Sequence, residues 1–144
     1  MSPNSTILLV EDNEDDAFFM KQALKDADIA NPLQIVDDGQ AAIDYLEGTG
    51  QLADRKKYPL PMVVFLDLKL PYKSGHEVLQ WIRSRPEFEM LVVIVLTSSS
   101  EQVDLRRSYQ LGANSFVVKP PTRDQLLALA EAFKLWWLRH NRVA

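Results

Sequence analysis

Short apolar runs alternate along the chain with segments whose apolar residues recur at the spacing of an α-helix. Each run has the length of a strand and is mostly aliphatic or aromatic. The continuously apolar runs 7–10, 63–66 and 91–96 predict strands buried on both faces of a sheet. The runs cover residues 7–10, 33–36, 63–66, 91–96 and 115–118. The helical segments extend from 13 to about 25, from 40 to about 47, from 75 to about 85, from 99 to about 112 and from 123 to about 137.

Polar residues mark the starts of these helical segments. Asn13 precedes the first segment, and three later ones begin with Ser or Thr followed three residues later by Glu or Gln. Such pairs are typical of helix amino termini, where the hydroxyl binds a free backbone N–H. The pairs are Ser74–Glu77, Ser98–Glu101 and Thr122–Gln125, and we expect each to cap its helix.

Strict alternation of strands and helices predicts an α/β fold, with a five-stranded parallel sheet covered by helices on both faces. A length of 144 residues suits one domain, so we expect residues 1–144 to form a single unit with a core at about 5–140. The polar segment 48–61 lies directly before the third strand and is predicted to be an exposed loop.

Composition excludes several kinds of function. The net charge is -4, which does not favour a nucleic-acid or anionic-membrane surface. No apolar run is long enough to span a bilayer, and the amino terminus lacks the features of a signal peptide. Cysteine is absent and only two histidines occur, which excludes thiolate metal sites and argues against multi-histidine ones. We expect a cytoplasmic protein.

Chemically useful side chains follow four of the five predicted strands. Because the carboxyl ends of parallel strands share one edge of the sheet, these side chains should converge in one pocket. They are Glu11, Asp12, Asp67, Thr97 and Lys119. Asp15 and Asp16, by contrast, are expected to belong to a solvated first helical turn.

Clustered carboxylates repel one another unless a cation joins them, and hard oxygen ligands favour Mg²⁺. Asp67 beside Mg²⁺, with a lysine and a hydroxyl opposite, would be a suitable nucleophile for a phosphoryl group. Each residue also has a structural interpretation: Asp67 and the Glu11–Asp12 pair as helix or turn caps, Thr97 as a strand-end residue and Lys119 as a solvent lysine. Their convergence on one edge favours the functional interpretation.

These residues and their spacing resemble the receiver domain of two-component response regulators, over nearly the whole chain. The matching segments are 7–12, 66–71 with Gly75, 96–98, and 112–113 leading to 119–120. The resemblance implies the flavodoxin-like arrangement of CheY-like proteins. The chain is also similar to the small single-domain response regulators that work with phytochromes, in its form and in loop 48–61.

The resemblance further implies a role for each site residue. Asp67 would accept a phosphoryl group from a sensor histidine kinase or a phosphotransfer protein and later lose it by self-catalysed hydrolysis. Mg²⁺ would be held by Asp12 and Asp67 directly, by Glu11 through water and by the Lys69 backbone carbonyl. Thr97 and Lys119 would bind the phosphoryl oxygens, and the Lys119–Pro120 bond would be cis.

A two-state switch is part of the same expectation. Phosphorylation would draw Thr97 inward, vacate space for Phe116, and reshape the face made by the fourth helix, fifth strand and fifth helix. A downstream protein and a second copy of the chain, giving a homodimer, are the candidate partners of that face. Trp136 and Trp137 are adjacent and cannot share one helix face, so Trp137 is expected in the core. Trp136 is then left either for a partner or a second copy of the chain, or to lie flat over the edge of the helix.

Two other functions compete with this one. Phosphatases that form aspartyl phosphate carry an acid two residues after the nucleophile, where this chain has Lys69. A receiver that binds partners without being phosphorylated would not need the acids, the threonine and the lysine that this chain retains. Labelling by acetyl phosphate distinguishes the three.

Overall fold

Five strands of the chain form one parallel sheet whose order is β2-β1-β3-β4-β5. This structure is a computed structural model and describes residues 5–140. The strands are β1 Thr6–Val10, β2 Leu33–Val36, β3 Pro61–Leu66, β4 Val92–Thr97 and β5 Ser115–Val118. All five predicted strands are therefore present, each within two residues of its predicted bounds, in the expected doubly wound arrangement.

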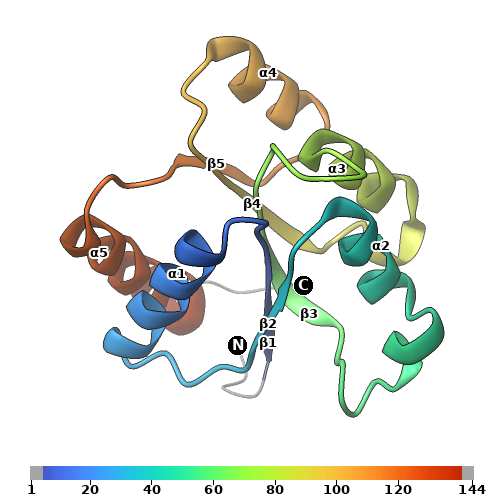
Figure 1. Cartoon of the computed structure of the whole chain (residues 1–144), viewed down its shortest axis with the longest axis horizontal. Helices are drawn as coiled ribbons and strands as arrows, with labels where there is room; N and C mark the ends of the chain where they lie inside the picture. The colour runs from blue at the N-terminus through green and yellow to red at the C-terminus, as the bar shows by residue number, and fades with distance from the viewer. Residues whose placement is uncertain (1–4, 141–144) are drawn as a thin grey trace.

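Helices cover both faces of this sheet (Figure 1). The α-helices are α1 Glu14–Asp26, α2 Gly39–Glu47, α3 Gly75–Ser84, α4 Gln102–Gln110 and α5 Arg123–Phe133. Short 3-10 helices lie at η1 Gly50–Ala53 and η2 Pro86–Phe88, and a π-helix, η3 Lys134–His140, continues α5. Within the described residues no helix is both long and apolar enough to cross a bilayer.

The alternation of side chains along each strand divides the core into two layers. Ile7 and Leu9 point toward α1 and α5, whereas Leu8 and Val10 point toward α2 and α3. The central strands are buried on both faces, which is why their sequences are continuously apolar rather than alternating.

Helix caps agree with the sequence at most positions. Asn13 accepts a hydrogen bond from Asp16 N–H, and Ser74 with Glu77 forms both bonds of a capping box. Thr122 accepts a bond from Gln125 N–H. The pair Ser98–Glu101 was wrongly predicted, since α4 begins only after Glu101 and has no side-chain cap.

The segment between α2 and β3 is held against α2 by one arginine. Arg55 donates hydrogen bonds to the carbonyl oxygens of Tyr45, Leu46 and Tyr58 at 2.8, 2.8 and 3.2 Å. The bonds to Tyr45 and Leu46 satisfy carbonyls at the carboxyl end of α2, which otherwise lack partners, and the bond to Tyr58 ties the following segment to them. The loop that the sequence predicts at 48–61 is thus tied to the helix before it.

The two adjacent tryptophans separate as expected. Trp137 is half-buried and packs against the core layer under α1 and α5, while Trp136 is 64% exposed.

Candidate functional site

Parallel register brings the strand ends to one edge of the sheet. Val10 is paired with Leu66, and Leu66 with Val95. Thr97 is paired with Val118 at the end of β5. The residues that follow these strands, Glu11, Asp67 and Lys119, therefore meet although they lie far apart in the sequence.

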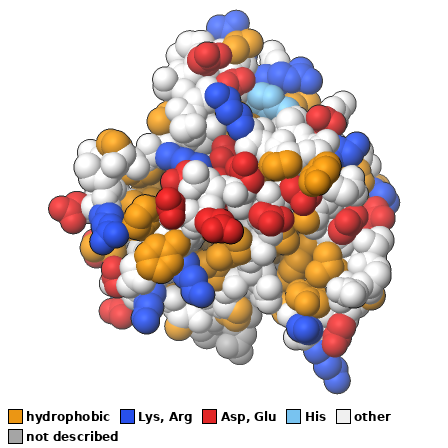
Figure 2. Space-filling model, viewed as in Figure 1, with side chains coloured by type: hydrophobic (Ala, Val, Ile, Leu, Met, Phe, Trp, Pro, Cys, Tyr) orange, Lys and Arg blue, Asp and Glu red, His pale blue; other side chains and the backbone are white. Residues whose placement is uncertain are grey.

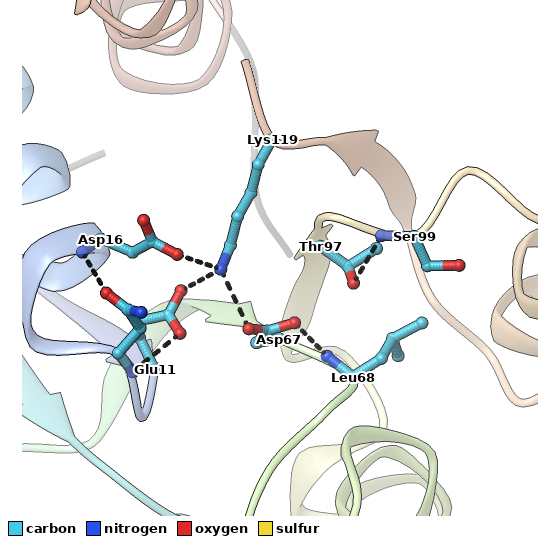
Figure 3. Close-up of polar contacts among 8 residues, drawn as sticks. Glu11, Asp16, Asp67, Leu68, Thr97, Ser99 and Lys119 are labelled. Carbon is cyan, nitrogen blue, oxygen red and sulfur yellow. Dashed lines mark hydrogen bonds and ion pairs between the residues drawn. The ribbon is translucent and has the colours of Figure 1, made fainter. Parts of the chain in front are cut away.

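Lys119 is the centre of the site. Its Nζ lies 2.5 Å from Glu11 Oε1, 2.9 Å from Asp16 Oδ2 and 3.0 Å from Asp67 Oδ2. Figure 3 shows the lysine reaching across the strand ends, with the three carboxylates around its ammonium group. The three protons of the ammonium group are thus matched by three acceptors.

Asp67 is buried and is held in place by hydrogen bonds to the backbone of Val10 and Leu68. Its N–H donates to Val10 O at 3.1 Å, and its Oδ1 accepts a hydrogen bond from Leu68 N–H at 2.7 Å. The start of α3 presses against this segment: Gly75 N–H donates to Leu68 O at 2.8 Å, and a Cβ at Gly75 would lie 2.1 Å from Asp67 O. The amino end of α3 therefore sets the position of the aspartate.

Three carboxyl groups are placed to share a cation. One oxygen from each of Glu11, Asp12 and Asp67 lies within 4.8 Å of the other two, with Glu11 and Asp67 buried and Asp12 exposed. A set of hard carboxylate oxygens, open to solvent on one side, fits Mg²⁺, which keeps part of its water shell. The residues expected to hold the metal through their side chains are thus brought together.

Burial and hydrogen bonding compete in setting the pKa values of Glu11 and Lys119. Burial raises the pKa of the Glu11 carboxyl to about 7; the hydrogen bond from Lys119 opposes this shift and the charge of Asp67 adds to it. Burial alone would lower the pKa of the Lys119 ammonium, but hydrogen bonds to Glu11, Asp16 and Asp67 outweigh it and raise the pKa. Lys119 therefore remains positively charged. It offsets part of the repulsion between the carboxylates that surround it.

A chain of hydrogen bonds leads from Thr97 to α3. Thr97 is fully buried, and its Oγ1 accepts a bond from Ser99 N–H at 3.3 Å. The Ser99 hydroxyl donates to Asp104 Oδ2 at 2.5 Å, and the Ser108 hydroxyl donates to Asp104 O at 2.8 Å. His76 Nε2 lies 3.0 Å from the Ser108 hydroxyl oxygen. The site is thereby connected to α4 and to the first turn of α3.

The remaining predicted residues lie around this centre. Phe116 is half-buried in β5, and its N–H donates to the hydroxyl of Tyr109 on α4 at 3.1 Å. Lys69 lies two residues after Asp67 with its side chain exposed.

The prediction of a cis bond before Pro120 was wrong, since the described residues contain no cis peptide bond. The trans form is intrinsically favoured by about 0.5–1 kcal/mol even before proline. Lys119 makes all its contacts with the acids in that form.

Asp16 was assigned to a solvated helical turn, yet it pairs with Lys119. It occupies the third position of α1, where its N–H is bound by the Asn13 side chain. The sequence contains a signal for this contact, since α1 begins beside the site and its third residue lies on the first turn. Only the structure shows that Lys119 reaches it.

The outer surface of the site is acidic. Figure 2, in the same view as Figure 1, shows Asp and Glu side chains gathered across the middle of this face, with basic side chains close by. A surface of this kind attracts a cation.

Fold and site together define a class of signalling protein, the response regulators. Residues 7–131 match the family model of the response regulator receiver domain, and the chain belongs to this family.

Two relatives match over nearly the whole of this chain. The chain is 39% identical over 139 residues to the probable methanogenesis regulatory protein FilR2 of Methanothrix harundinacea, covering 94% of this chain and 85% of that protein. It is 34% identical over 137 residues to the response regulator Rcp1 of Synechocystis, covering 95% and 91%.

Solved structures of response regulators have the same fold as this chain. The phosphorylated cyanobacterial phytochrome response regulator RcpA has a TM-score of 0.90 at 32% identity, covering 97% of this chain and 98% of that one. The Mn²⁺-bound form of Rcp1 has a TM-score of 0.87 at 33% identity, covering 97% and 99%.

Proposed function

We propose that Asp67 is the phosphoacceptor and that it takes its phosphoryl group from a sensor histidine kinase or a phosphotransfer protein in a Mg²⁺-dependent reaction. The observation that carries this proposal is the contact of Lys119 Nζ with Asp67 Oδ2 at 3.0 Å, beside the cluster of Glu11, Asp12 and Asp67. A carboxylate between a fixed ammonium group and a cation site is suited to attack a phosphoryl group.

The proposed metal ligands are Asp12 and Asp67 directly, Glu11 through water, and the Lys69 backbone carbonyl. The existence of an Mn²⁺-bound form of Rcp1 supports a divalent cation in this family. Bound Mg²⁺ would offset negative charge on the phosphoryl oxygens.

In the proposed transfer, an Asp67 oxygen attacks the phosphorus of a phosphohistidine. The new P–O bond forms as the P–N bond breaks, and the imidazole nitrogen keeps the electron pair. Lys119 would exchange its contacts with Glu11 and Asp67 for a contact with a phosphoryl oxygen, and the Thr97 hydroxyl would donate to another. Within residues 5–140 the Thr97 hydroxyl accepts a bond from Ser99 N–H and donates none, so its own proton is available for this contact.

We propose that the same site also removes the phosphoryl group. Water would attack the phosphorus and the P–O bond to Asp67 would break, which restores the carboxylate and releases inorganic phosphate. The rate of this hydrolysis would set the lifetime of the phosphorylated protein, which would act as a signalling protein rather than as an enzyme on an external substrate.

The proposed output runs through α4, β5 and α5, with residues 1–144 acting as one receiver unit. Thr97 and Phe116 are the proposed switch residues. Two contacts support this route: Ser99 connects the segment after Thr97 to Asp104 on α4, and Tyr109 connects α4 to Phe116. A shift of Thr97 toward a phosphoryl group would disturb both, and the α4–β5–α5 face would then contact a downstream protein or a second copy of the chain.

Similarity to RcpA makes a phytochrome-type sensor kinase one candidate donor, whereas similarity to FilR2 does not. A sensor histidine kinase takes its phosphoryl group from ATP, so the proposal places the protein in the cytoplasm.

The test is intact mass after incubation with acetyl phosphate and Mg²⁺, with Asp67→Asn in parallel. We expect one phosphoryl group on the wild type, none on Asp67→Asn, and none on the wild type after the metal is chelated. An unlabelled wild type would contradict the proposal, and continuous turnover of simple phosphomonoesters would point to a phosphatase instead.

A further inference from the structure

One contact of Lys119 is not explained by metal or phosphoryl binding. Asp16 Oδ2 lies 2.9 Å from Lys119 Nζ, but Asp16 is outside the group of acids that could share a cation. Its carboxylate comes from α1 and lies with Glu11 on one side of the lysine, whereas Thr97 and Ser99 lie on the other side of Asp67 (Figure 3).

The other two partners of the lysine have competing tasks. Glu11 and Asp67 both belong to the cation cluster, and Asp67 is also the proposed nucleophile. When a cation and a phosphoryl group occupy the site, the oxygens of these two acids are drawn toward them. Asp16 is the one acidic partner in the described structure that Lys119 can keep throughout.

Asp16 is itself well fixed. Its N–H is bound by Asn13 Oδ1 at 2.9 Å, and the next residue, Ala17, is buried against the core under α1. A lysine side chain has four rotatable carbon bonds and loses much freedom when it is held in one place. The fixed Asp16 carboxylate keeps the Lys119 ammonium group close to Asp67 without occupying the space in front of Asp67.

We infer that Asp16 is a positioning residue for phosphoryl transfer: it holds the Lys119 ammonium over Asp67 while the other acids engage the cation and the phosphoryl group. The inference rests on the function proposed above. Asp16 should act through the negative charge of its carboxylate and through its contact distance to Lys119. Its substitution should change the rate of phosphoryl transfer.

The experiment measures the initial rate of labelling by acetyl phosphate at fixed Mg²⁺, followed by intact mass. The variants are Asp16→Asn, which keeps the shape but removes the charge, and Asp16→Glu, which restores the charge on a longer side chain. Asp15→Asn is the matched control, because Asp15 is exposed on the same turn and makes no ion pair with Lys119. The thermal unfolding of each variant is measured in parallel to check that its fold is intact.

Asp16 is 44% exposed, so loss of its charge-assisted contact should be moderate. We expect Asp16→Asn to be labelled about three- to tenfold more slowly, Asp16→Glu to recover most of that loss, and Asp15→Asn to match the wild type.

An Asp16→Asn variant as fast as the wild type, or faster, overturns the inference while leaving the proposed function intact. Equal slowing by Asp15→Asn overturns it too, because the effect would then come from net charge. A wild type that takes no label overturns the proposed function and the inference together.

Discussion

Substitution of Gly75 by alanine tests how the amino end of α3 positions the phosphoacceptor. The added Cβ would lie 2.1 Å from Asp67 O and 2.7 Å from Leu68 Cα, whereas real Cβ contacts below 3.0 Å are essentially unknown. Both neighbours are backbone atoms and cannot rotate away. The segment that carries Asp67 and the start of α3 must therefore separate by about 1 Å.

The energetic cost follows from that displacement. Overpacking of this kind costs about 1–3 kcal/mol, and the better helix propensity of alanine returns at most about 1 kcal/mol. We expect a net loss of about 2 kcal/mol in the free energy of unfolding, which lowers the Tm by roughly 4–8 °C for a domain of this size. A shift of about 1 Å in a reacting group can slow a reaction by up to about 100-fold, and we expect labelling to slow at least about tenfold.

Urea denaturation and the initial rate of labelling by acetyl phosphate measure the two effects. Gly50→Ala is the control, because φ is +58° there and no atom lies within 4 Å of its added Cβ. That variant should lose about 1–2 kcal/mol through backbone strain alone and keep the wild-type labelling rate. If Gly75→Ala changes stability by less than about 0.5 kcal/mol and is labelled normally, the contact does not position Asp67 and the reasoning fails.

Two further predictions concern α3 and η3. Burial lowers the pKa of His76 below its usual 6.5, with Asp104 opposing and Arg107 adding to the shift, so the folded state binds its proton less readily than the unfolded state does. The contribution of His76 to the free energy of unfolding should therefore fall as the pH drops through about 6.5, whereas the raised pKa of Glu11 acts in the opposite direction in the wild type and in the variant alike. The stability of the wild type relative to His76→Gln should thus decrease between about pH 7.5 and pH 5.5, and parallel curves in urea denaturation would contradict this. Trp137 packs against the core and Trp136 is 64% exposed, so Trp137→Ala should cost about 2–4 kcal/mol and Trp136→Ala under about 1 kcal/mol, and equal losses would be inconsistent with this packing.

Local sequence determined the elements and the edge at which the site forms. Continuous apolar runs such as 63–66 can be satisfied only by a strand covered on both faces, and the alternation with helices then requires parallel strands. Parallel strands place their carboxyl ends together, so Glu11, Asp67 and Lys119 were predictable as neighbours from chain order alone. Capping at Ser74 was also predictable, because it involves residues of one helical turn.

Contacts between distant segments were decided only by the tertiary structure. The sequence gives Ser98–Glu101 the same pattern as Ser74–Glu77, but the Ser99 hydroxyl binds Asp104 instead and α4 starts later. By sequence Asp16 is an ordinary acid in the first turn of a helix. Its contact with Lys119, 103 residues later in the chain and directly after β5, is seen only in the tertiary structure.

The same holds for Gly75, which belongs to the segments that resemble receiver domains but whose local sequence does not explain why glycine is needed there. Its importance arises from the approach of α3 to the backbone of Asp67. Local patterns specify which hydrogen bonds a segment can form, whereas packing of the whole chain decides which of the competing partners is within reach.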